Sequence, residues 1–100
     1  LIVDTDYNIT AAAQFKCDFY RGKGENPLYF INHFVYSALS DKVLVPDPQL
    51  AAQANQPALI VERAKSCWQK TGRIPNFLYV DWYGQGDVVG AMQTLNELPR

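Results

Sequence analysis

The sequence predicts an α/β fold in which parallel strands alternate with helices and form one side of a larger barrel. Two segments, 28–34 and 77–80, are rich in apolar, aromatic and β-branched residues without clean alternation, which is typical of strands buried on both faces. A helical pattern follows each of them, and this order argues for a parallel sheet. Two such strands cannot close a sheet, so the pattern indicates part of a larger domain.

The first quarter of the chain carries weaker signals. Residues 1–3 form a short apolar run that can end a strand, and residues 4–20 are mixed. Residues 21–27 contain two glycines, an asparagine and a proline, which predicts a turn. The segment lacks the GxxxxGK[ST] pattern, so it is not predicted to be a phosphate-binding loop.

The middle of the chain predicts a loop followed by helices. Segment 37–48 carries polar residues and two prolines, which predicts an irregular loop of a length often linked to function. Residues 50–54 predict one or two helical turns. A clearer helix begins at Pro57 and ends at Gly72. Its apolar positions, spaced for one face, are Ile60, Val61, Ala64, Cys67 and Trp68. The charged positions expected mostly off that face are Glu62, Arg63, Lys65 and Lys70.

A final helix is predicted after the second strand. Gly84 and Gly86 bracket a turn, and Asp87 is a good N-cap residue. Pro99 lies just beyond the end of this helix. The positions expected to face a core are Val88, Val89, Met92 and Leu95.

Composition and charge exclude several classes of protein. The chain has 100 residues, of which 48% are hydrophobic and 19% charged, with a formal net charge of −1. This length can bury a core, so one domain segment over residues 1–100 is expected. A near-neutral charge argues against a nucleic-acid partner. No apolar run approaches the roughly 20 residues of a membrane helix. The chain starts at Leu1 without a signal-peptide pattern, so we expect further residues upstream.

The two cysteines do not decide whether the protein belongs to an oxidising or a reducing compartment. Cys17 and Cys67 can be two buried thiols or one disulfide in a secreted protein. The N-glycosylation sequon at residues 8–10 favours secretion, although such triplets often occur by chance.

Polar residues at the predicted strand ends are the candidate site, because the carboxyl ends of barrel strands form the active-site face. Asp81 directly follows segment 77–80 and can bind substrate, orient a catalytic base or cap a turn. Trp82 and Tyr83 come next and can line a pocket or pack. His33, the only histidine, is interpreted as a base, nucleophile or metal ligand, or as a hydrogen-bonded residue of the barrel rim.

Two further groups are weaker candidates. Asp4, Asp6 and Tyr7 can contact a hydroxylated ligand or belong to a solvated loop. Arg21 beside Gly22 can hold a phosphate, although a surface arginine is the common case. One histidine and two widely separated cysteines offer no metal-binding spacing, so no metal and no other cofactor is predicted.

Two strand motifs and several shorter segments occur in a characteristic order. The motifs are LYFINHF at 28–34 and NFLYVDWY at 76–83, with Cys67 between them. Weaker matches are DTDYNIT at 4–10, QFKC at 14–17, RG at 21–22, AN at 54–55, GD at 86–87 and LN at 95–96. Together they cover nearly the whole chain and resemble the secreted phosphatidylinositol-specific phospholipase C-like phosphodiesterases, which have an X-domain-type TIM barrel.

The resemblance implies both a fold and a covalent link. Segments 28–34 and 77–80 correspond to the last two strands of a (β/α)8 barrel, so the chain is expected to be its C-terminal part, incomplete by itself. Cys17 and Cys67 match cysteines that look paired in this family, which implies a disulfide and a secreted or extracellular protein.

The resemblance also implies an activity: metal-independent hydrolysis of a phosphoric diester, such as a phosphoinositide, in lipid metabolism. One histidine acts as the base that helps the inositol 2-hydroxyl attack phosphorus, a second acts as the acid, and an arginine stabilises the developing charge. These residues belong to the N-terminal half of the family's barrel and are absent here. The chain alone is therefore expected to be inactive, and a membrane surface is a further candidate partner.

A few roles carry over to this chain. Asp81 matches a strand-end aspartate that can orient the catalytic histidine, as a supporting residue. Asp4 and Tyr7 match inositol-contacting positions more weakly, and His33 matches neither catalytic histidine. The expected substrate-binding residues are Asp4, Tyr7, His33, Trp82 and Tyr83. Two alternatives remain: a non-catalytic barrel, as a pseudoenzyme or binding module, and a glycerophosphodiester phosphodiesterase, which needs a metal-binding carboxylate set that is not seen.

Overall fold

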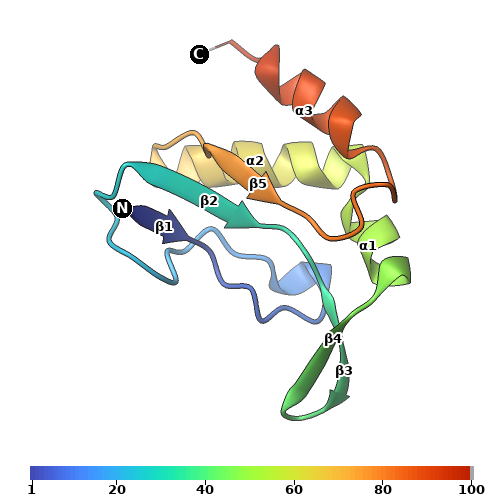
Figure 1. Cartoon of the computed structure of the whole chain (residues 1–100). Coiled ribbons are helices and arrows are strands. Elements are labelled where there is room, and N and C mark those ends of the chain that lie inside the picture. Colours follow the sequence, from blue (N-terminus) through green and yellow to red (C-terminus); the bar gives the residue numbers. More distant parts are fainter. Residues whose placement is uncertain (100) are drawn as a thin grey trace.

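The computed structural model describes residues 1–99 and contains a three-stranded parallel sheet, three α-helices, a short 3-10 helix (Ala12–Gln14) and a separate β-hairpin (Figure 1). The sheet has the order β1-β2-β5, with strands β1 (Ile2–Asp4), β2 (Leu28–Asn32) and β5 (Phe77–Tyr79). Both pairings are parallel, so all three carboxyl ends lie at one edge of the sheet. We call this the carboxyl edge. The predicted α/β fold with a parallel sheet is confirmed.

One face of the sheet packs against the long helix α2 and forms the main core. Side chains alternate along the strands, so Val3, Tyr29 and Ile31 point to this face and are fully buried. Cys67 of α2 belongs to the same cluster, and Leu78 packs against it. This alternation explains why β2 reads as an uninterrupted apolar run, because its other face is aromatic as well.

The opposite face of the sheet carries aromatic side chains and is largely open. Phe30 packs against Phe77 in a tilted arrangement and against Tyr79 edge to face, with ring centroids 4.7 and 5.0 Å apart. Phe77 and Tyr79 are nevertheless 49% and 50% exposed. The prediction that 77–80 is buried on both faces is therefore wrong for this structure, because β5 is an edge strand whose aromatic face has no cover among residues 1–99.

A hairpin replaces the irregular loop predicted for residues 37–48. Strands β3 (Tyr36–Ser40) and β4 (Val43–Pro46) pair antiparallel and extend away from the sheet at the carboxyl edge (Figure 1). The two prolines were read as signals against regular structure. Pro46 instead ends β4, and Pro48 occupies the first turn of a helix. At both positions the N–H group that proline lacks is not required for a hydrogen bond within the element.

Helix ends follow the local signals closely. Helix α1 (Pro48–Ala54) begins slightly before the expected turns, since the carboxylate of Asp47 accepts hydrogen bonds from two backbone N–H groups of the first turn. Helix α2 (Pro57–Thr71) begins and ends as predicted. It is closed by Gly72 in the left-handed conformation, with φ 72°.

Arg63 lies on the buried face of α2, which corrects the prediction that it falls off that face. Ile60 and Cys67 are fully buried as expected, whereas Val61 and Trp68 are only partly buried. Arg63 is 7% exposed. Its guanidinium reaches backbone carbonyl groups at the carboxyl edge, and a charge pattern cannot reveal such partners.

Helix α3 (Val88–Asn96) packs against α2 and starts at the predicted N-cap, Asp87, whose carboxylate accepts a hydrogen bond of 2.9 Å from the Gly90 N–H. Ala91 is its fully buried position, while Val89 is exposed, so the expectation for Val89 is wrong. The helical spacing places Val89 off the packed face. The three other predicted positions are partly buried: Val88, Met92 and Leu95.

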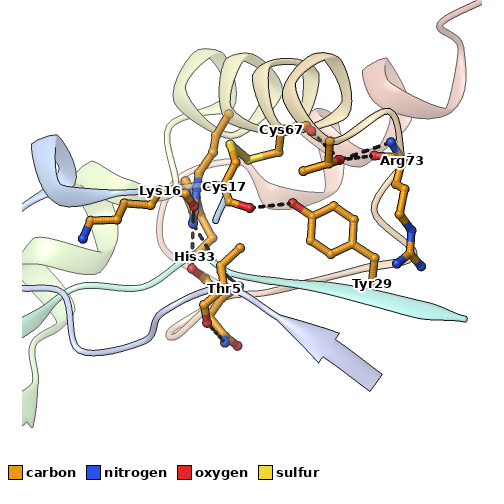
Figure 2. The surroundings of a disulfide bond; sticks show 10 residues. Thr5, Lys16, Cys17, Tyr29, His33, Cys67 and Arg73 are labelled. Atoms are coloured by element: carbon orange, nitrogen blue, oxygen red, sulfur yellow. Dashed lines mark hydrogen bonds between the residues drawn. A yellow bond between two sulfur atoms is a disulfide. The ribbon is translucent and has the colours of Figure 1, made fainter. Parts of the chain in front are cut away.

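A disulfide joins Cys17 and Cys67, as the resemblance implied (Figure 2). The Cα atoms are 5.0 Å apart, and the bond links the irregular segment before β2 to the buried face of α2. Neither cysteine is free. Within residues 1–99, no helix has the length and apolar character needed to cross a membrane.

Candidate functional site

The carboxyl edge gathers several of the polar and charged side chains of this chain. Asp4 and Asn32 are the last residues of β1 and β2, and Asp81 follows β5 closely. These three residues are far apart in the sequence, and the parallel register brings them to one end of the sheet. Loops that leave this edge add the remaining candidates.

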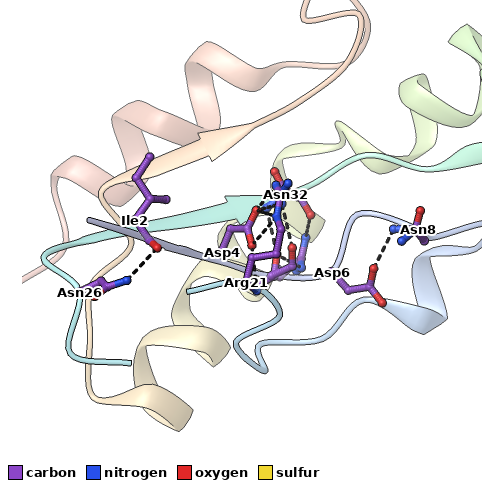
Figure 3. A network of polar contacts seen from close by, with 9 residues as sticks. Ile2, Asp4, Asp6, Asn8, Arg21, Asn26 and Asn32 are labelled. Carbon is purple, nitrogen blue, oxygen red and sulfur yellow. Dashed lines mark hydrogen bonds and ion pairs between the residues drawn. The ribbon is translucent and has the colours of Figure 1, made fainter. Parts of the chain in front are cut away.

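Asp4 is the centre of a polar network at the edge (Figure 3). Its buried carboxylate forms an ion pair with Arg21, which includes an Nε–H to Oδ2 hydrogen bond of 3.0 Å. The Arg21 backbone N–H also donates to Oδ1, at 3.2 Å. Asn32 donates from Nδ2 to Oδ2 of Asp4 at 3.1 Å and to the Thr5 carbonyl at 2.8 Å. The hydrogen bond from Arg21 raises the pKa of its guanidinium above the ordinary value.

The Arg21 side chain remains accessible although it is paired. It is 61% exposed, and its guanidinium lies 4.6 Å above the centre of the Tyr7 ring. Tyr20 supports Tyr7 with an edge contact at 5.6 Å. Because Asp4 orients the guanidinium and much of it stays exposed to solvent, it can donate hydrogen bonds to a phosphate oxygen. The sequence raised Arg21 as a phosphate ligand but favoured a plain surface role. Its pairing with Asp4 could not be read from the sequence.

Asp81 has the environment of a carboxylate that lacks a partner. It is partly buried, and its Oδ2 atom is buried without a hydrogen bond from residues 1–99. Burial raises the pKa of Asp81 above its usual range. Burial, and then the charges of Asp81 and Tyr7, raise the pKa of the Tyr36 phenol above its usual range. Sequence reasoning missed Tyr36, which lies between the predicted strand 28–34 and the predicted loop 37–48.

His33 does not face the open edge. It is fully buried and stacks on Phe15, with ring centroids 4.5 Å apart. Arg63 can only donate, so Nδ1 of His33 accepts from its NH1 at 3.2 Å and Nε2–H donates to the Ala54 carbonyl at 2.7 Å. Burial lowers the pKa of His33 to about 4, so the ring is neutral at pH 7. Both ring nitrogens are used within the fold, and we assign this histidine a structural role.

Arg63 connects the strand ends to the disulfide-linked segment. Its guanidinium donates to the carbonyl oxygens of Asn32 at 2.7 Å and Lys16 at 2.8 Å. It also lies 4.2 Å from the centre of the Phe15 ring. Burial lowers the pKa of Arg63 to about 10, which still leaves it charged at pH 7. The carboxyl edge therefore rests on a buried cation held by backbone carbonyl groups.

The remaining predicted residues lie on loops at the same edge. Trp82 and Tyr83 follow Asp81 and are exposed, and Trp82 has a left-handed backbone with φ 52°. Asp6 accepts a hydrogen bond of 2.9 Å from the Asn8 N–H and so stabilises its own loop (Figure 3). Among residues 1–99, no three His, Cys, Asp or Glu side chains are placed to hold a metal ion.

A separate pocket of about 110 Å³ lies between α2, β5 and α3. Its walls are largely apolar, with Trp68, Leu78, Met92 and Leu95 among them, and Lys65 is the only ionisable residue that lines it within residues 1–99. It also includes residues 74–76, which precede β5. We place the candidate site at the carboxyl edge because the ionisable groups are there.

Comparison with known proteins gives one match. The family model described as PI-PLC X 1, from the PI-PLC X family, matches residues 1–96. No curated protein matches the chain, and no solved structure does. The family match includes the three strands of the sheet, the disulfide and the carboxyl edge, which is nearly the entire chain. The chain therefore belongs to the PI-PLC X family.

Proposed function

We propose that this chain forms one side of the active site of a PI-PLC X-type barrel that hydrolyses a phosphodiester, such as a phosphoinositide. The observation that carries the proposal is the position of Asp4, with its partner Arg21, and of Asp81 at the carboxyl edge of a parallel sheet. Enzymes built on parallel α/β barrels form their sites at this end of the strands. Family membership supports the relationship to phospholipase C.

The barrel itself is part of the proposal. In a (β/α)8 barrel, one face of the sheet packs against helices and the other fills the interior with side chains from opposite strands. The open aromatic face with Phe30, Phe77 and Tyr79 fits the interior face, and the face against α2 fits the outside. The outer backbone edge of β5 pairs with no strand among residues 1–99, and a further strand would satisfy it. The outer edge of β1 is already bridged at Asp4 by the backbone of residues 20–21.

Each residue at the edge has a distinct role in this proposal. Arg21 binds a phosphate oxygen through its exposed guanidinium, and Asp4 holds that guanidinium in place. Asp81 accepts a hydrogen bond from a catalytic histidine on another part of the barrel, which would engage its unpartnered Oδ2. Such a bond fixes the orientation of the imidazole and stabilises its protonated form. Tyr7, Trp82 and Tyr83 contact the headgroup.

The acid and the base must come from outside this chain. Its single histidine, His33, is buried and neutral, with both ring nitrogens engaged. A residue in that state can neither take a proton from a hydroxyl group nor give one to a leaving group. The chain alone is therefore expected to lack phosphodiesterase activity.

The same observation favours a second candidate, a non-catalytic barrel that keeps the pocket. A pseudoenzyme would retain the Asp4–Arg21 pair for binding and would lack the two histidines elsewhere. It differs from the enzyme in one result: it binds the headgroup and releases no product.

We also propose that the protein works outside the cell, next to a lipid surface. The Cys17–Cys67 disulfide fits an oxidising compartment. The residues that would meet a lipid surface project near the carboxyl edge, with exposed Trp82 and Tyr83 on one loop and Leu39 on the hairpin. Tryptophan and tyrosine rings favour the region between headgroups and water.

The test measures hydrolysis of phosphatidylinositol in vesicles by the intact protein, with glycerophosphoinositol as the competing substrate class. Asp81→Asn is expected to lower kcat by up to about 10⁴-fold, the effect of losing a carboxylate that orients a catalytic histidine. Arg21→Gln is expected to lower kcat by roughly 10²- to 10³-fold, the effect of losing one donor to the developing charge. Asp18→Asn is the matched control, an exposed aspartate outside the edge. Headgroup binding without turnover in the unmutated protein would support the pseudoenzyme, and equal activity of all variants would contradict both.

A further inference from the structure

The loop between β5 and α3, residues 81–87, carries Asp81 at its start and lies at the carboxyl edge. A single buried residue, Asn55 between α1 and α2, contacts both ends of this loop, the start through its side chain and the end through its backbone carbonyl. We propose that Asn55 is a positioning residue that fixes the 81–87 loop, and with it the Asp81 carboxylate, in the orientation that the catalytic histidine requires. This inference rests on the function proposed above for Asp81.

The amide of Asn55 holds the start of the loop. Asn55 is 1% exposed, and its Nδ2 donates to the carbonyl oxygens of Asp81 at 2.9 Å and Trp82 at 3.2 Å. Trp82 is the residue in the left-handed conformation, with φ 52°. A non-glycine residue keeps that conformation only where its surroundings support it. The bond from Asn55 to its carbonyl provides this support.

The backbone of Asn55 holds the end of the loop. Its carbonyl oxygen accepts a hydrogen bond of 3.3 Å from the N–H of Asp87, the N-cap of α3. Gly86 lies directly against this carbonyl, and a β carbon there would overlap the Asn55 carbonyl oxygen. Gly86 also has φ 72°, a conformation that side chains disfavour. Gly86 thus allows the close approach that completes the contact.

The chemistry of the contact requires an amide. Two carbonyl oxygens face the Asn55 side chain, so the group opposite them has to donate twice, as an NH₂ group does. A carboxylate of the same shape would repel both carbonyl groups. Oδ1 of Asn55 is buried without a partner among residues 1–99. An unpaired buried oxygen is unfavourable, so the presence of an asparagine at this position is explained by its NH₂ group alone.

The support continues beneath Asn55. The carbonyl of the preceding residue, Ala54, accepts a hydrogen bond from Nε2–H of His33, and Arg63 donates to the other nitrogen of that ring. These bonds fix the backbone next to Asn55 relative to His33, which directly follows β2. The structural role of His33 is therefore to join the end of β2 to the backbone beside Asn55, the residue that holds the 81–87 loop.

The experiment compares variants on both sides of the contact in the intact protein. Asn55→Ala removes the donors, and Gly86→Ala forces the loop away. The matched controls are neighbours outside the contact: Gln56→Ala, an exposed residue, and Gly84→Ala, where an added β carbon meets nothing within 4 Å. The readouts are the Asp81 carboxyl pKa, from NMR titration of ¹³C-labelled aspartate, and kcat and KM for the phosphodiester.

We expect both contact variants to lower the Asp81 pKa toward the value of an exposed aspartate, because a released loop exposes the carboxylate to water. They are expected to lower kcat by about 10- to 10²-fold with little change in KM, the effect of a small misplacement. Both controls are expected to match the unmutated protein. An unchanged Asp81 pKa in folded Asn55→Ala and Gly86→Ala would overturn the inference.

Two features separate this inference from the proposed function. The Asp81 titration does not require activity, so the change in the Asp81 pKa can be measured even if the protein is a pseudoenzyme. If the variants do not fold, the unmutated protein decides: the Asn55 side-chain NH₂ protons are expected to exchange slowly with solvent and to show nuclear Overhauser contacts with Trp82. Rapid exchange without such contacts would refute the positioning role.

Discussion

The burial of neutral His33 makes a quantitative prediction about stability and pH. The pKa of His33 is about 4 in the folded protein, against 6.5 for an unperturbed histidine. As the pH falls, the unfolded chain therefore binds a proton before the folded protein does. The stability that this difference represents is complete above pH 6.5 and is lost progressively as the pH falls toward 4.

The magnitude follows from these two pKa values. At pH 5 the unfolded histidine is almost fully protonated and the folded one is mostly neutral, so linkage gives a loss of about 2 kcal/mol relative to pH 7. At pH 4 the loss rises to about 3 kcal/mol. Such losses are large beside the total stability of a typical domain.

The assay is urea unfolding of the intact protein and of His33→Gln at pH 7, 6, 5 and 4. Glutamine keeps one donor and one acceptor for Ala54 and Arg63 but does not titrate. The difference between the two proteins cancels the other groups that titrate in this range. The free energy of unfolding of the unmutated protein is expected to fall more steeply below pH 6.5. Parallel profiles, or a His33 pKa near 6.5 by NMR, would refute the reasoning.

Two further predictions concern stability. Replacing Cys17 and Cys67 by serine is expected to lower the free energy of unfolding by about 4 kcal/mol, because the disulfide closes a loop with a sequence separation of 50; denaturant titration with and without reductant measures this, and an equal stability of the oxidised and reduced protein would contradict it. Gly22→Ala is expected to cost well above the roughly 1 kcal/mol expected for Gly72→Ala, since both glycines have positive φ but only the first would bring a β carbon against the Ile2 carbonyl oxygen. Thermal melts of the two variants compare these costs, and similar melting temperatures would argue against the close approach.

Local features of the fold were readable from the sequence because neighbouring residues determine them. Pro57, Gly72 and Asp87 mark helix ends through backbone geometry and hydrogen bonds within a few positions. The aromatic and β-branched runs predicted two of the three strands. The hairpin was missed because its prolines lie at element ends, where they do no harm, and local composition does not reveal this.

The candidate site was only partly predictable. Asp81 was named because strand ends of α/β barrels carry functional groups, and Asp4 because it lies in a polar cluster that weakly matches inositol-contacting positions. The structure brings both to the carboxyl edge. Tyr36 and Asn55 were not named as site residues, since nothing within their own segments points to their partners. The bonds of Asn55 to the 81–87 loop join residues 26 or more positions apart.

The sequence alone therefore determined the α/β order of elements, the family resemblance and the placement of carboxylates after strands. The tertiary structure decided which charged groups lie inside and which remain open. The residues that flank Arg63 and Arg21 in the sequence do not distinguish the two arginines. Arg63 is nevertheless buried against backbone carbonyl groups, whereas Arg21 is exposed and paired with Asp4. The physical reason is that burial, desolvation and pairing depend on contacts between segments distant in sequence, which only the assembled sheet and helices create.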